Sequence, residues 1–424
     1  MKNIYEKSIL DNGLKIISHN MPGRESAALG IWIKVGGRYE NTANKGISHF
    51  LEHILFKGTK KYSCRLLKES IEGIGGSLNG FTSEESTCYL VKVPATRLST
   101  GLSILSDMVI NPTLPAAEIN KEKTVILEEL KMYKDLPQSY VYELLDELLW
   151  PKQPLGEPII GTVESVNSVD RAKLSDFKEG NYTASNMVVS ACGNLDRVAL
   201  ERAVKKIFSG LKKRQANTFK AFKAKEPAVG LKVFHKETEQ THMALGFRSF
   251  KREHPLKHAV GLLHVILGAN MSSRLFNEVR EKRGLAYEIG TVIKRFQDTG
   301  AFIVHAGIDN RKVYEALPLI FKELKKAVDN LVTVDEFNRA KEFYIGQLRL
   351  ALEDTLEHML WIGETTLMLD RTFSIQDVIA EVKRVNRDDL RRAAREIFIE
   401  KNINLSLIGP LGAAQDKIRQ TLSL

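Results

Sequence analysis

The feature that most constrains the fold of this 424-residue chain is an internal repeat. Residues 13–35 read GLKIISHNMPGRESAALGIWIKV, and residues 230–250 read GLKVFHKETEQTHMALGFRSF. Both copies hold Gly-Leu-Lys, a histidine shortly after it, and Ala-Leu-Gly at the start of a second strand-like run. Each half then continues as two helices, hairpin-like strands and long helices, and ends on similar strands at 186–196 and 402–412. Because the order of elements also matches, two unrelated domains that share a short string are a poorer explanation than a duplication.

A duplicated chain of this length exceeds what one hydrophobic core usually organises. We predict an α+β fold of two homologous domains, each a mixed, mostly antiparallel sheet packed with helices, which together form a clamshell. The predicted division is a first domain at 1–212, a basic and polar linker at 213–227, and a second domain at 228–424.

The composition excludes several classes of protein. Lysine and arginine total 62 against 52 acidic residues, but the basic residues are scattered among glutamates, and the densest basic stretch, 205–225, overlaps the linker. Nucleic-acid binding from charge alone would predict salt-sensitive retention of DNA or RNA, and no nucleic-acid module is present. Three cysteines suit a reducing compartment, and neither a signal peptide nor a transmembrane span of about 18 apolar residues is evident. We therefore expect a cytoplasmic chain with no nucleic-acid or membrane partner.

The strongest chemical signal is the segment His49-Phe50-Leu51-Glu52-His53. On a helix, His49 and His53 lie one turn apart on the same face and can bind one metal ion, and Glu52 reaches the same space as a base. The alternative is a pair of ordinary histidines on an amphipathic helix. The apolar stripe that predicts the helix consists of Ile47, Leu51, Ile54 and Leu55.

A catalytic zinc site usually takes three protein ligands, so the third must come from elsewhere in the chain. Glu122 and Glu129 lie two helical turns apart and share a face with Val125, Ile126 and Tyr133, which we interpret as the buried stripe of a helix. Glu128 shares its side with lysines, as a solvated residue would. Because a carboxylate on an apolar stripe is costly unless it is ligated, we predict Glu129 as the third ligand and Glu122 as a carboxylate that orients a histidine or assists the site. The alternative places Glu129 at the rim of the stripe, where it reaches solvent.

These residues carry a resemblance to a known family. The stretch 37–59 resembles the signature of the insulinase/pitrilysin family of zinc peptidases, most closely its half-length branch, which includes mitochondrial processing peptidase and bacterial relatives. The resemblance covers nearly the whole chain, including GEPIIGTVESV at 156–166. Family members have a glutamate ligand in a V-I-x-x-E context, which is Glu129 here, and another functional glutamate seven residues earlier, which is Glu122. The resemblance implies one Zn²⁺ per chain, held by the two motif histidines and Glu129.

The segment 75–93 reads as a turn and two extended runs, which alone would be an ordinary hairpin. The family uses an N-A-x-T element here to bind an extended peptide at a sheet edge. This chain has Asn79, Gly80, Phe81 and Thr82, and the glycine in place of alanine predicts a looser strand. The resemblance implies that these four residues bind substrate.

Arg280 and Tyr287 lie in REKRGLAYEIG. Taken alone they would be a salt-bridged arginine and a core tyrosine. The family has an arginine and a tyrosine at this spacing, which contact substrate and stabilise the oxyanion. The resemblance therefore implies that both residues take part in catalysis.

The repeat shows what the second half lacks. Aligning EHILF with LHVIL places Leu263 and Val260 opposite the glutamate and the first histidine of the motif, and His264 opposite the second histidine. The second half thus keeps the helix and loses the metal site. We expect His264 and His258 to be packing or surface residues.

Together these features predict a zinc-dependent endopeptidase that cleaves peptides or unfolded segments enclosed between two domains, with Glu52 as the general base. The alternative is a non-catalytic structural or assembly subunit of the family, or the partner-dependent half of a heterodimer. The intact motif, with Arg280 and Tyr287, favours a self-sufficient enzyme, which we expect to be a homodimer. Glu84 and Glu85, beside the proposed edge strand, are candidates for binding basic peptide segments.

Overall fold

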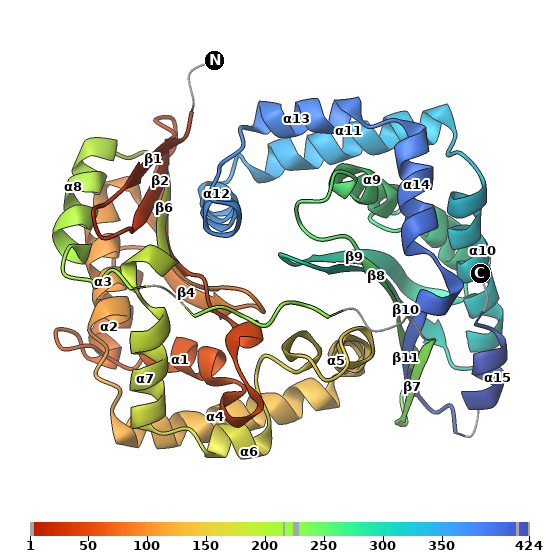
Figure 1. The fold of residues 1–424 in the computed structure, drawn as a ribbon, viewed down its shortest axis with the longest axis horizontal. Coiled ribbons are helices and arrows are strands. Elements are labelled where there is room, and N and C mark those ends of the chain that lie inside the picture. The colour runs from red at the N-terminus through yellow and green to blue at the C-terminus, as the bar shows by residue number, and fades with distance from the viewer. Residues whose placement is uncertain (1–3, 215–216, 224–228, 413–414, 423–424) are drawn as a thin grey trace. The chain divides into compact units, whose positions relative to one another are not determined.

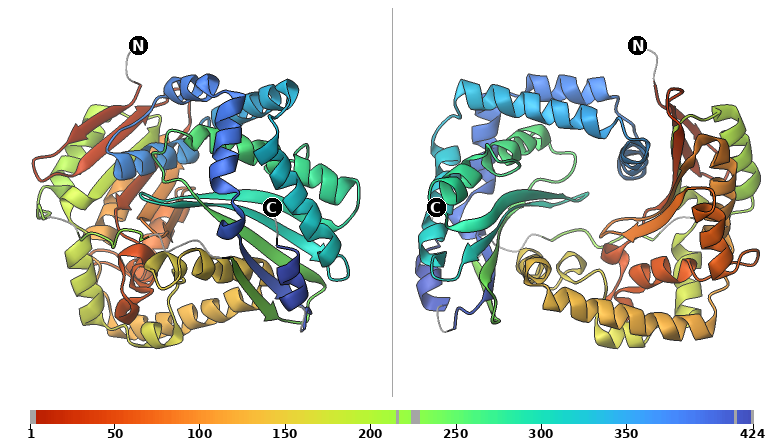
Figure 2. Two further views of the ribbon diagram at one scale, coloured as in Figure 1. Left: turned by 45° about the vertical axis from the view of Figure 1, so that its right-hand side comes forward. Right: turned by 180° about the vertical axis from the view of Figure 1, so that it is seen from behind.

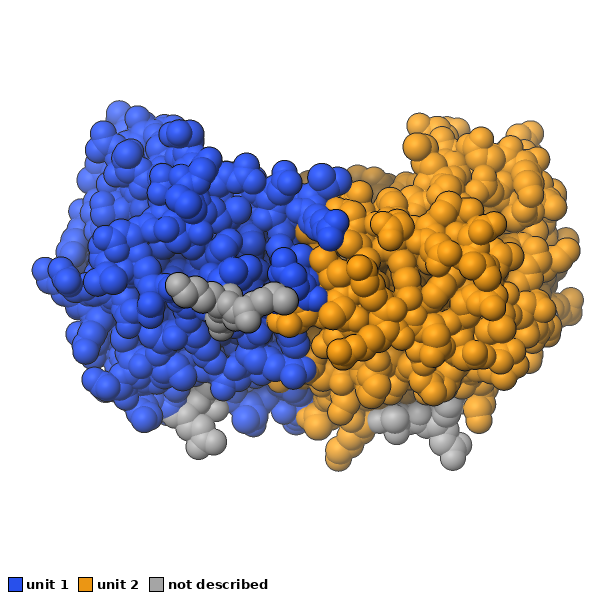
Figure 3. Space-filling view, turned by 90° about the horizontal axis from the view of Figure 1, so that it is seen from above, with its two compact units in different colours: residues 1–130, 158–220, 349–376 blue, residues 131–157, 221–348, 377–424 orange. Residues whose placement is uncertain are grey.

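The computed structural model describes residues 4–214, 217–223, 229–412 and 415–422. These residues form two compact units, which Figure 3 colours separately. Unit 1 comprises residues 1–130, 158–220 and 349–376, and unit 2 comprises 131–157, 221–348 and 377–424. Within the described ranges, no helix is both long and apolar enough to cross a membrane.

Unit 1 is built on a six-stranded sheet with the order β1-β2-β6-β3-β5-β4. β2 and β6 are parallel, and every other neighbouring pair is antiparallel. The central strands are buried nearly throughout, because helices such as α3 (Leu98–Ile110) and α12 (Thr355–Leu369) pack on the sheet. The strands are β1 (Glu6–Ile9), β2 (Lys15–Asn20), β3 (Ser26–Ile33), β4 (Ser77–Thr82), β5 (Thr87–Pro94) and β6 (Met187–Gly193).

Alternate residues of β3 enter two different cores, because successive side chains of a strand point to opposite faces. Leu29 and Ile31 join the core that includes the apolar side of α1. Ala28 and Trp32 join a second core with Met359 of α12, which lies along β6 and β3 (Figures 1 and 2). The helices are α1 (Ile47–Leu55), α2 (Cys64–Glu72), α3 (Leu98–Ile110), α4 (Ala116–Asp135, which continues into unit 2), α6 (Val163–Asn167), α7 (Arg171–Asn181), α8 (Arg197–Phe208) and α12 (Thr355–Leu369).

Unit 2 repeats this design with the strand order β7-β11-β8-β10-β9. Its parallel pair is β7 and β11, and the other pairs are antiparallel, so the order and directions match β2-β6-β3-β5-β4 of unit 1. The prediction of two homologous domains with mixed, mostly antiparallel sheets is confirmed at the level of the sheets. The strands are β7 (Gly230–His235), β8 (Gln240–Ser249), β9 (Ala286–Arg295), β10 (Gly300–Asp309) and β11 (Asn404–Gly409).

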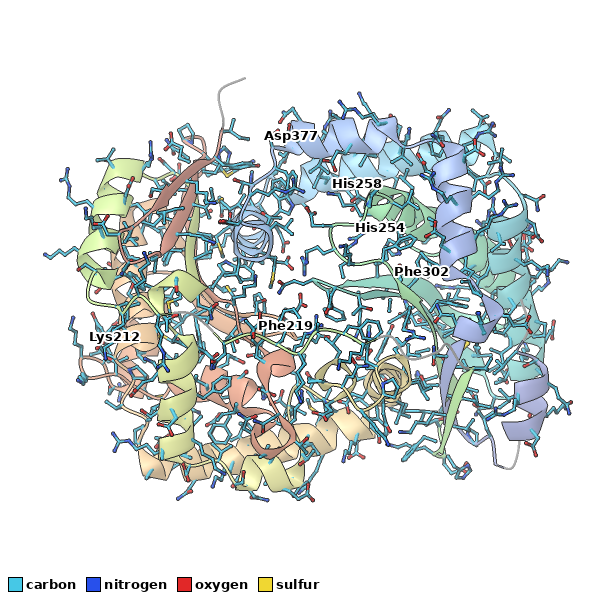
Figure 4. All side chains as sticks on the ribbon, in the orientation of Figure 1. Lys212, Phe219, His254, His258, Phe302 and Asp377 are labelled. Carbon is cyan, nitrogen blue, oxygen red and sulfur yellow. The ribbon has the colours of Figure 1, made fainter. Side chains whose placement is uncertain are left out.

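The sheet of unit 2 is also covered on two faces. On one face, Phe302 and Phe247 pack edge-on against Phe398, each with a ring-centroid separation of 5.2 Å (Phe302 is labelled in Figure 4). On the other face lies α5, which packs on β8 and β11. The helices are α5 (Pro137–Leu149), α9 (Lys257–Leu267), the π-helical turn η6 (Phe276–Glu281), α10 (Val313–Asp329), α11 (Val334–Ala351), α13 (Ile375–Arg384), α14 (Arg387–Ile397) and α15 (Gln415–Gln420); α11 and α13 each continue into unit 1.

The compact units differ from the two halves of the sequence. α5 comes from the first half and belongs to unit 2, whereas α12 comes from the second half and belongs to unit 1. The predicted division at 1–212, 213–227 and 228–424 follows the repeat. It does not anticipate that each half contributes one helix, α5 or α12, to the unit built mainly from the other half. Part of the predicted linker, at 215–216 and 224–227, lies outside the described residues.

The glycine of the repeated Ala-Leu-Gly is closely approached by a helix in both units. A Cβ at Gly30 would lie 2.5 Å from the Sδ atom of Met359 on α12. A Cβ at Gly246 would lie 3.0 Å from both Cδ atoms of Leu145 on α5. In each sheet, therefore, the glycine of the central strand leaves room for the exchanged helix.

Candidate metal centre

The motif helix α1 begins at a glycine that cannot cap it with a side chain. Gly46 has φ +86°, and a Cβ there would lie 2.5 Å from the carbonyl oxygen of Ile160, so only glycine fits. The buried carboxylate of Glu40 caps the helix instead, accepting hydrogen bonds from the amides of Gly46 (2.9 Å) and Ser48 (2.7 Å). A negative charge at a helix N-terminus also complements the helix dipole. These contacts determine where α1 starts, and hence where the motif lies.

The three predicted metal ligands lie together. The Oε2 atom of Glu129 is 3.8 Å from Nε2 of His49 and 3.6 Å from Nε2 of His53. One potential ligand atom of each residue lies within 4.8 Å of the others, and no second such group occurs among the described residues. In a tetrahedral zinc site with bonds of about 2.0–2.2 Å, ligand atoms are about 3.3–3.6 Å apart. Two imidazole nitrogens and one carboxylate this close together are a donor set that would suit zinc.

Glu122 joins this group through a hydrogen bond. Its Oε1 atom accepts from Nδ1 of His53 at 3.0 Å, and its Oε2 atom lies 2.5 Å from the ammonium of Lys57. Because an ionised carboxylate can only accept, Nδ1 of His53 is the donor, and the Nε2 atom lies on the other side of the ring, 3.6 Å from Oε2 of Glu129. His49 differs, because its buried Nδ1 atom has no hydrogen-bond partner among the described residues.

The reasoning that selected Glu129 from the sequence was wrong in one respect. The buried positions of α4 are Ile119, Glu122, Ile126 and Leu130. Of the three apolar residues predicted to form the buried stripe, Ile126 is buried, but Val125 and Tyr133 are 49% and 38% exposed, so the stripe is only partly buried beside Glu129. Helical spacing identified which residues share a face, but what packs against that face depends on the tertiary structure.

The carboxylate of Glu52 is largely shielded from water. Burial, as the largest cause, raises its pKa to about 7, while His53 opposes this change and Glu129 and Glu122 add to it. A carboxylate with a pKa near neutrality can both take and return a proton. A Cβ at Gly80 on β4 would lie 3.0 Å from Oε1 of Glu52 and 3.2 Å from Cζ of Phe56, so the missing methyl group leaves space beside this carboxylate.

The two histidines respond to their surroundings in opposite directions. Burial, and next the neighbouring His53, lowers the pKa of His49 to about 3, so its imidazole is neutral at pH 7. Burial also disfavours a charged His53, but the hydrogen bond with Glu122 and the nearby carboxylates outweigh it and raise the pKa of His53. The contacts with His53 and Lys57 likewise outweigh burial at Glu122 and lower the pKa of that carboxyl.

The predicted substrate-binding residues lie on β4, at the edge of the sheet of unit 1. The strand pairs regularly with β5, with Gly80 opposite Tyr89, so the glycine does not interrupt the ladder. Asn79 is exposed, and the ring of Phe81 packs edge-on against Trp32 with 5.6 Å between ring centroids. The Oγ1 atom of Thr82 is buried without a hydrogen-bond partner among the described residues. Their substrate contacts stay a prediction.

Glu85 does not suit the predicted role in binding basic peptide segments. Its buried carboxylate accepts a 2.6 Å hydrogen bond from Arg38, which is also buried. The Arg38 guanidinium in turn lies 3.8 Å from the ring centroid of Phe219 (labelled in Figure 4). A buried ion pair is costly to break, so the carboxylate of Glu85 stabilises the fold through Arg38 and is not available to bind a peptide.

Arg280 and Tyr287 belong to unit 2. Tyr287 is 73% exposed, which excludes the interpretation as a core tyrosine. The guanidinium of Arg280 lies 4.7 Å from the ring centroid of Phe276 and 5.4 Å from that of Tyr287. The catalytic role that the resemblance implies for both residues stays a prediction.

The other histidines of interest in unit 2 have protein partners. His258, labelled in Figure 4, is 2.7 Å from a carboxylate oxygen of Glu381, and His264 is 2.7 Å from the hydroxyl of Thr291. Both match the expectation of packing or surface residues.

Sequence reasoning missed two residues that support the centre, Glu40 and Lys57. The available signal for Glu40 was that Gly46 precedes a helix and offers no capping side chain, so another group had to do so. The signal for Lys57 was its position one turn after His53, from which it can reach the same side of the helix.

Comparisons with known proteins identify the family of this chain. Residues 15–163 match the family model described as "Insulinase (Peptidase family M16)", and residues 168–344 match the one described as "Peptidase M16 inactive domain". The chain is 36% identical to an uncharacterised zinc protease of Streptomyces coelicolor, covering 96% of this chain and 89% of the relative. It is 35% identical to an uncharacterised zinc protease of Bacillus subtilis, covering 95% and 97%.

Solved structures show the same fold. The crystal structure of a protease from Helicobacter pylori matches with a TM-score of 0.90 at 23% identity, covering 96% of this chain and 99% of that one. A structure titled as the peptidase M16 inactive domain from Pseudomonas fluorescens matches with a TM-score of 0.88 at 20% identity, covering 96% and 98%. The sequence matches over nearly the full length, together with the two-sheet fold, show that this chain belongs to the insulinase family of peptidases (peptidase family M16).

Proposed function

We propose that this chain is a zinc-dependent endopeptidase that binds one Zn²⁺ and hydrolyses peptides or unfolded segments. The observation that carries the proposal is the convergence of His49, His53 and Glu129 next to the largely buried carboxylate of Glu52. The names of the bacterial relatives as zinc proteases support the choice of metal.

The protein groups divide the work of hydrolysis. His49, His53 and Glu129 would hold the zinc ion, which when bound supplies Lewis-acid polarisation of the scissile carbonyl and of water. Glu52 takes a proton from the attacking water and passes it to the leaving amine, so that the C–N bond breaks with the proton balance closed. Glu122 keeps the imidazole of His53 in the orientation that presents Nε2.

Substrate binding is proposed for β4, the edge strand of the sheet of unit 1. An extended peptide can add to an edge strand through backbone hydrogen bonds, with Asn79, Gly80, Phe81 and Thr82 on the receiving strand. This mode requires an unfolded segment, because a folded protein does not present a free strand of this kind. Arg280 and Tyr287 are proposed to contact the substrate carbonyl. The active form is proposed to be a homodimer, and sedimentation of the purified chain would test this.

The decisive experiment compares hydrolysis of a quenched peptide and zinc stoichiometry in the wild type and in Glu52→Gln. The variant should retain one zinc per chain and lose hydrolysis by about 10²- to 10⁴-fold, the usual contribution of a general base. Glu128→Gln, which removes an exposed carboxylate beside Glu129, is the matched control and should leave both quantities unchanged.

Two results would contradict the proposal. If Glu52→Gln binds zinc and still hydrolyses the peptide at the wild-type rate, the assignment of the base is wrong. If the zinc-loaded wild type cleaves peptides only after another subunit is added, the chain is a partner-dependent half of a heterodimer.

A further inference from the structure

We propose that Lys57 is a positioning residue of the metal centre, which holds Glu122 in place so that Glu122 orients His53. This inference rests on the proposed zinc-binding function. It concerns a residue outside the H-x-x-E-H motif and outside the two glutamates discussed above.

The contacts form one connected line. The ammonium of Lys57 lies 2.5 Å from Oε2 of Glu122, and Oε1 of the same carboxylate accepts from Nδ1 of His53 at 3.0 Å. On the far side of the imidazole, Nε2 of His53 lies 3.6 Å from Oε2 of Glu129. Each oxygen of Glu122 is thus used by a different partner, and both partners come from the α1 segment.

Burial explains why this carboxylate needs a cation. The side chain of Glu122 is only 5% exposed, whereas that of Lys57 is 25% exposed. A buried carboxylate is costly unless it is paired and hydrogen-bonded. Lys57 supplies the charge from the protein surface, and the backbone amide of Lys57 donates to the carbonyl of Ile54 at 3.1 Å, which fixes where its side chain starts.

Within the described part of the chain, only His53 of the two histidines has a carboxylate that fixes the orientation of its ring. A metal-binding histidine commonly donates its other ring N–H to a carboxylate, which fixes the ring and makes the ligand more basic. His53 has this support, but the buried Nδ1 atom of His49 has no partner among the described residues. Displacement of Glu122 would therefore act on the metal first through the hydrogen bond with His53.

Two effects of removing the ammonium have opposite signs, so the sign of the change in zinc affinity is informative. If Lys57 acts only as a nearby positive charge, its removal relieves repulsion of a dication and tightens zinc binding. If Lys57 positions Glu122, its removal weakens zinc binding, because the hydrogen bond to His53 becomes less well held.

The test measures the zinc affinity of the full-length chain by competition with a chelating dye. Lys57→Met and, as a second neutral variant, Lys57→Gln should each bind Zn²⁺ about 10-fold more weakly than the wild type, at the lower end of the effect of such supporting contacts. Lys57→Arg, which restores a cation, should recover most of the affinity. Lys61→Met removes an exposed lysine four residues further on and should leave the affinity unchanged.

A double-mutant cycle shows whether Lys57 acts through Glu122. Glu122→Gln alone should weaken Zn²⁺ binding at least as much as Lys57→Met, and adding Lys57→Met to it should cause little further loss. Unchanged or tighter binding in both neutral variants, or a full further loss in the Glu122→Gln background, would overturn the inference. A wild-type chain that binds no Zn²⁺ would instead overturn the proposed function, which separates the two failures.

Discussion

The helices α1 of unit 1 and α9 of unit 2 occupy equivalent places in the repeat but have different tasks. In α1, one side packs into the core and the other carries His49 and His53, which meet Glu122 and Glu129 of α4. In α9, nearly every residue is buried, and only His264 remains of the motif.

The contacts of His264 differ from those of His53, its counterpart in the motif helix. Its Nδ1 atom lies 2.7 Å from the hydroxyl of Thr291, where His53 instead has a carboxylate. Burial, and next Arg295 and His305, lowers the pKa of His264 to about 4, so the imidazole is neutral at pH 7. The sheet of unit 2 therefore packs with a helix at this place without the metal motif, and metal chemistry depends on a few side chains that only one copy carries.

The largest expected effect comes from removing a ligand of the metal centre in unit 1. His53→Ala should remove bound zinc and peptide hydrolysis together, because two ligands and no orienting carboxylate contact remain. The matched change in unit 2, His264→Ala, should leave zinc stoichiometry at one per chain. Elemental analysis after gel filtration and a peptide assay measure both, and a loss of zinc in His264→Ala would show that the two helices are less independent than this comparison holds.

The next effect tests the exchanged helices. Met359 of α12 and Leu145 of α5 are fully buried, each against the sheet of the opposite half of the sequence. Replacing either by alanine should lower the free energy of unfolding by about 2–5 kcal/mol, the range for large-to-small core changes. Denaturant titration measures this loss, and a value below about 0.5 kcal/mol, typical of surface positions, would mean that the helix is not an integral part of that core.

A smaller effect distinguishes the two exchanged helices by pH. In α12, the imidazole of His358 donates from Nδ1 to the carbonyl of Leu352 and accepts at Nε2 from the hydroxyl of Tyr5, so it is held neutral. Burial, and next His19, lowers its pKa from 6.5 to about 4. The unfolded chain takes up the proton first, so stability is complete above pH 6.5 and is lost as the pH falls toward 4, by at most about 3 kcal/mol.

Hydrogen exchange is suited to locating this effect. After correction for intrinsic rates, the amides of α12 should exchange faster at pH 5 than at pH 7. The amides of α5, whose own Val141 and Leu145 are its core contacts, should change less. The difference should shrink in His358→Leu. Equal acid sensitivity of both helices in the wild type would contradict the assignment to His358.

The smallest effect concerns the repeated glycines. Gly30→Ala places a Cβ at 2.5 Å from Met359, and Gly246→Ala places one at 3.0 Å from Leu145. Overpacking of this kind costs about 1–3 kcal/mol, and we expect Gly246→Ala at the lower end, because its neighbour has less far to move. Thermal unfolding of the two variants shows which loses more stability. A larger loss in Gly246→Ala would show that α5 is packed more rigidly than α12.

Much of the fold and site follows from local patterns. The repeat predicted two homologous sheets, and their matching strand orders confirm it. The spacing of His49, Glu52 and His53 predicted one helical face, and the spacing of Glu122 and Glu129 predicted their common helix. What these patterns share is that helix and strand periods act over a few residues, so they can be read along the chain.

The tertiary structure alone decided the exchange of α5 and α12, the cap that Glu40 provides to α1, the burial of Glu85 against Arg38 and the contact of Lys57 with Glu122. It also decided that Val125 and Tyr133 are exposed beside Glu129. The physical reason is common to all of these. Periodicity determines which side chains share a face, but burial and charge pairing depend on which distant segment packs against that face, and no local spacing encodes that choice.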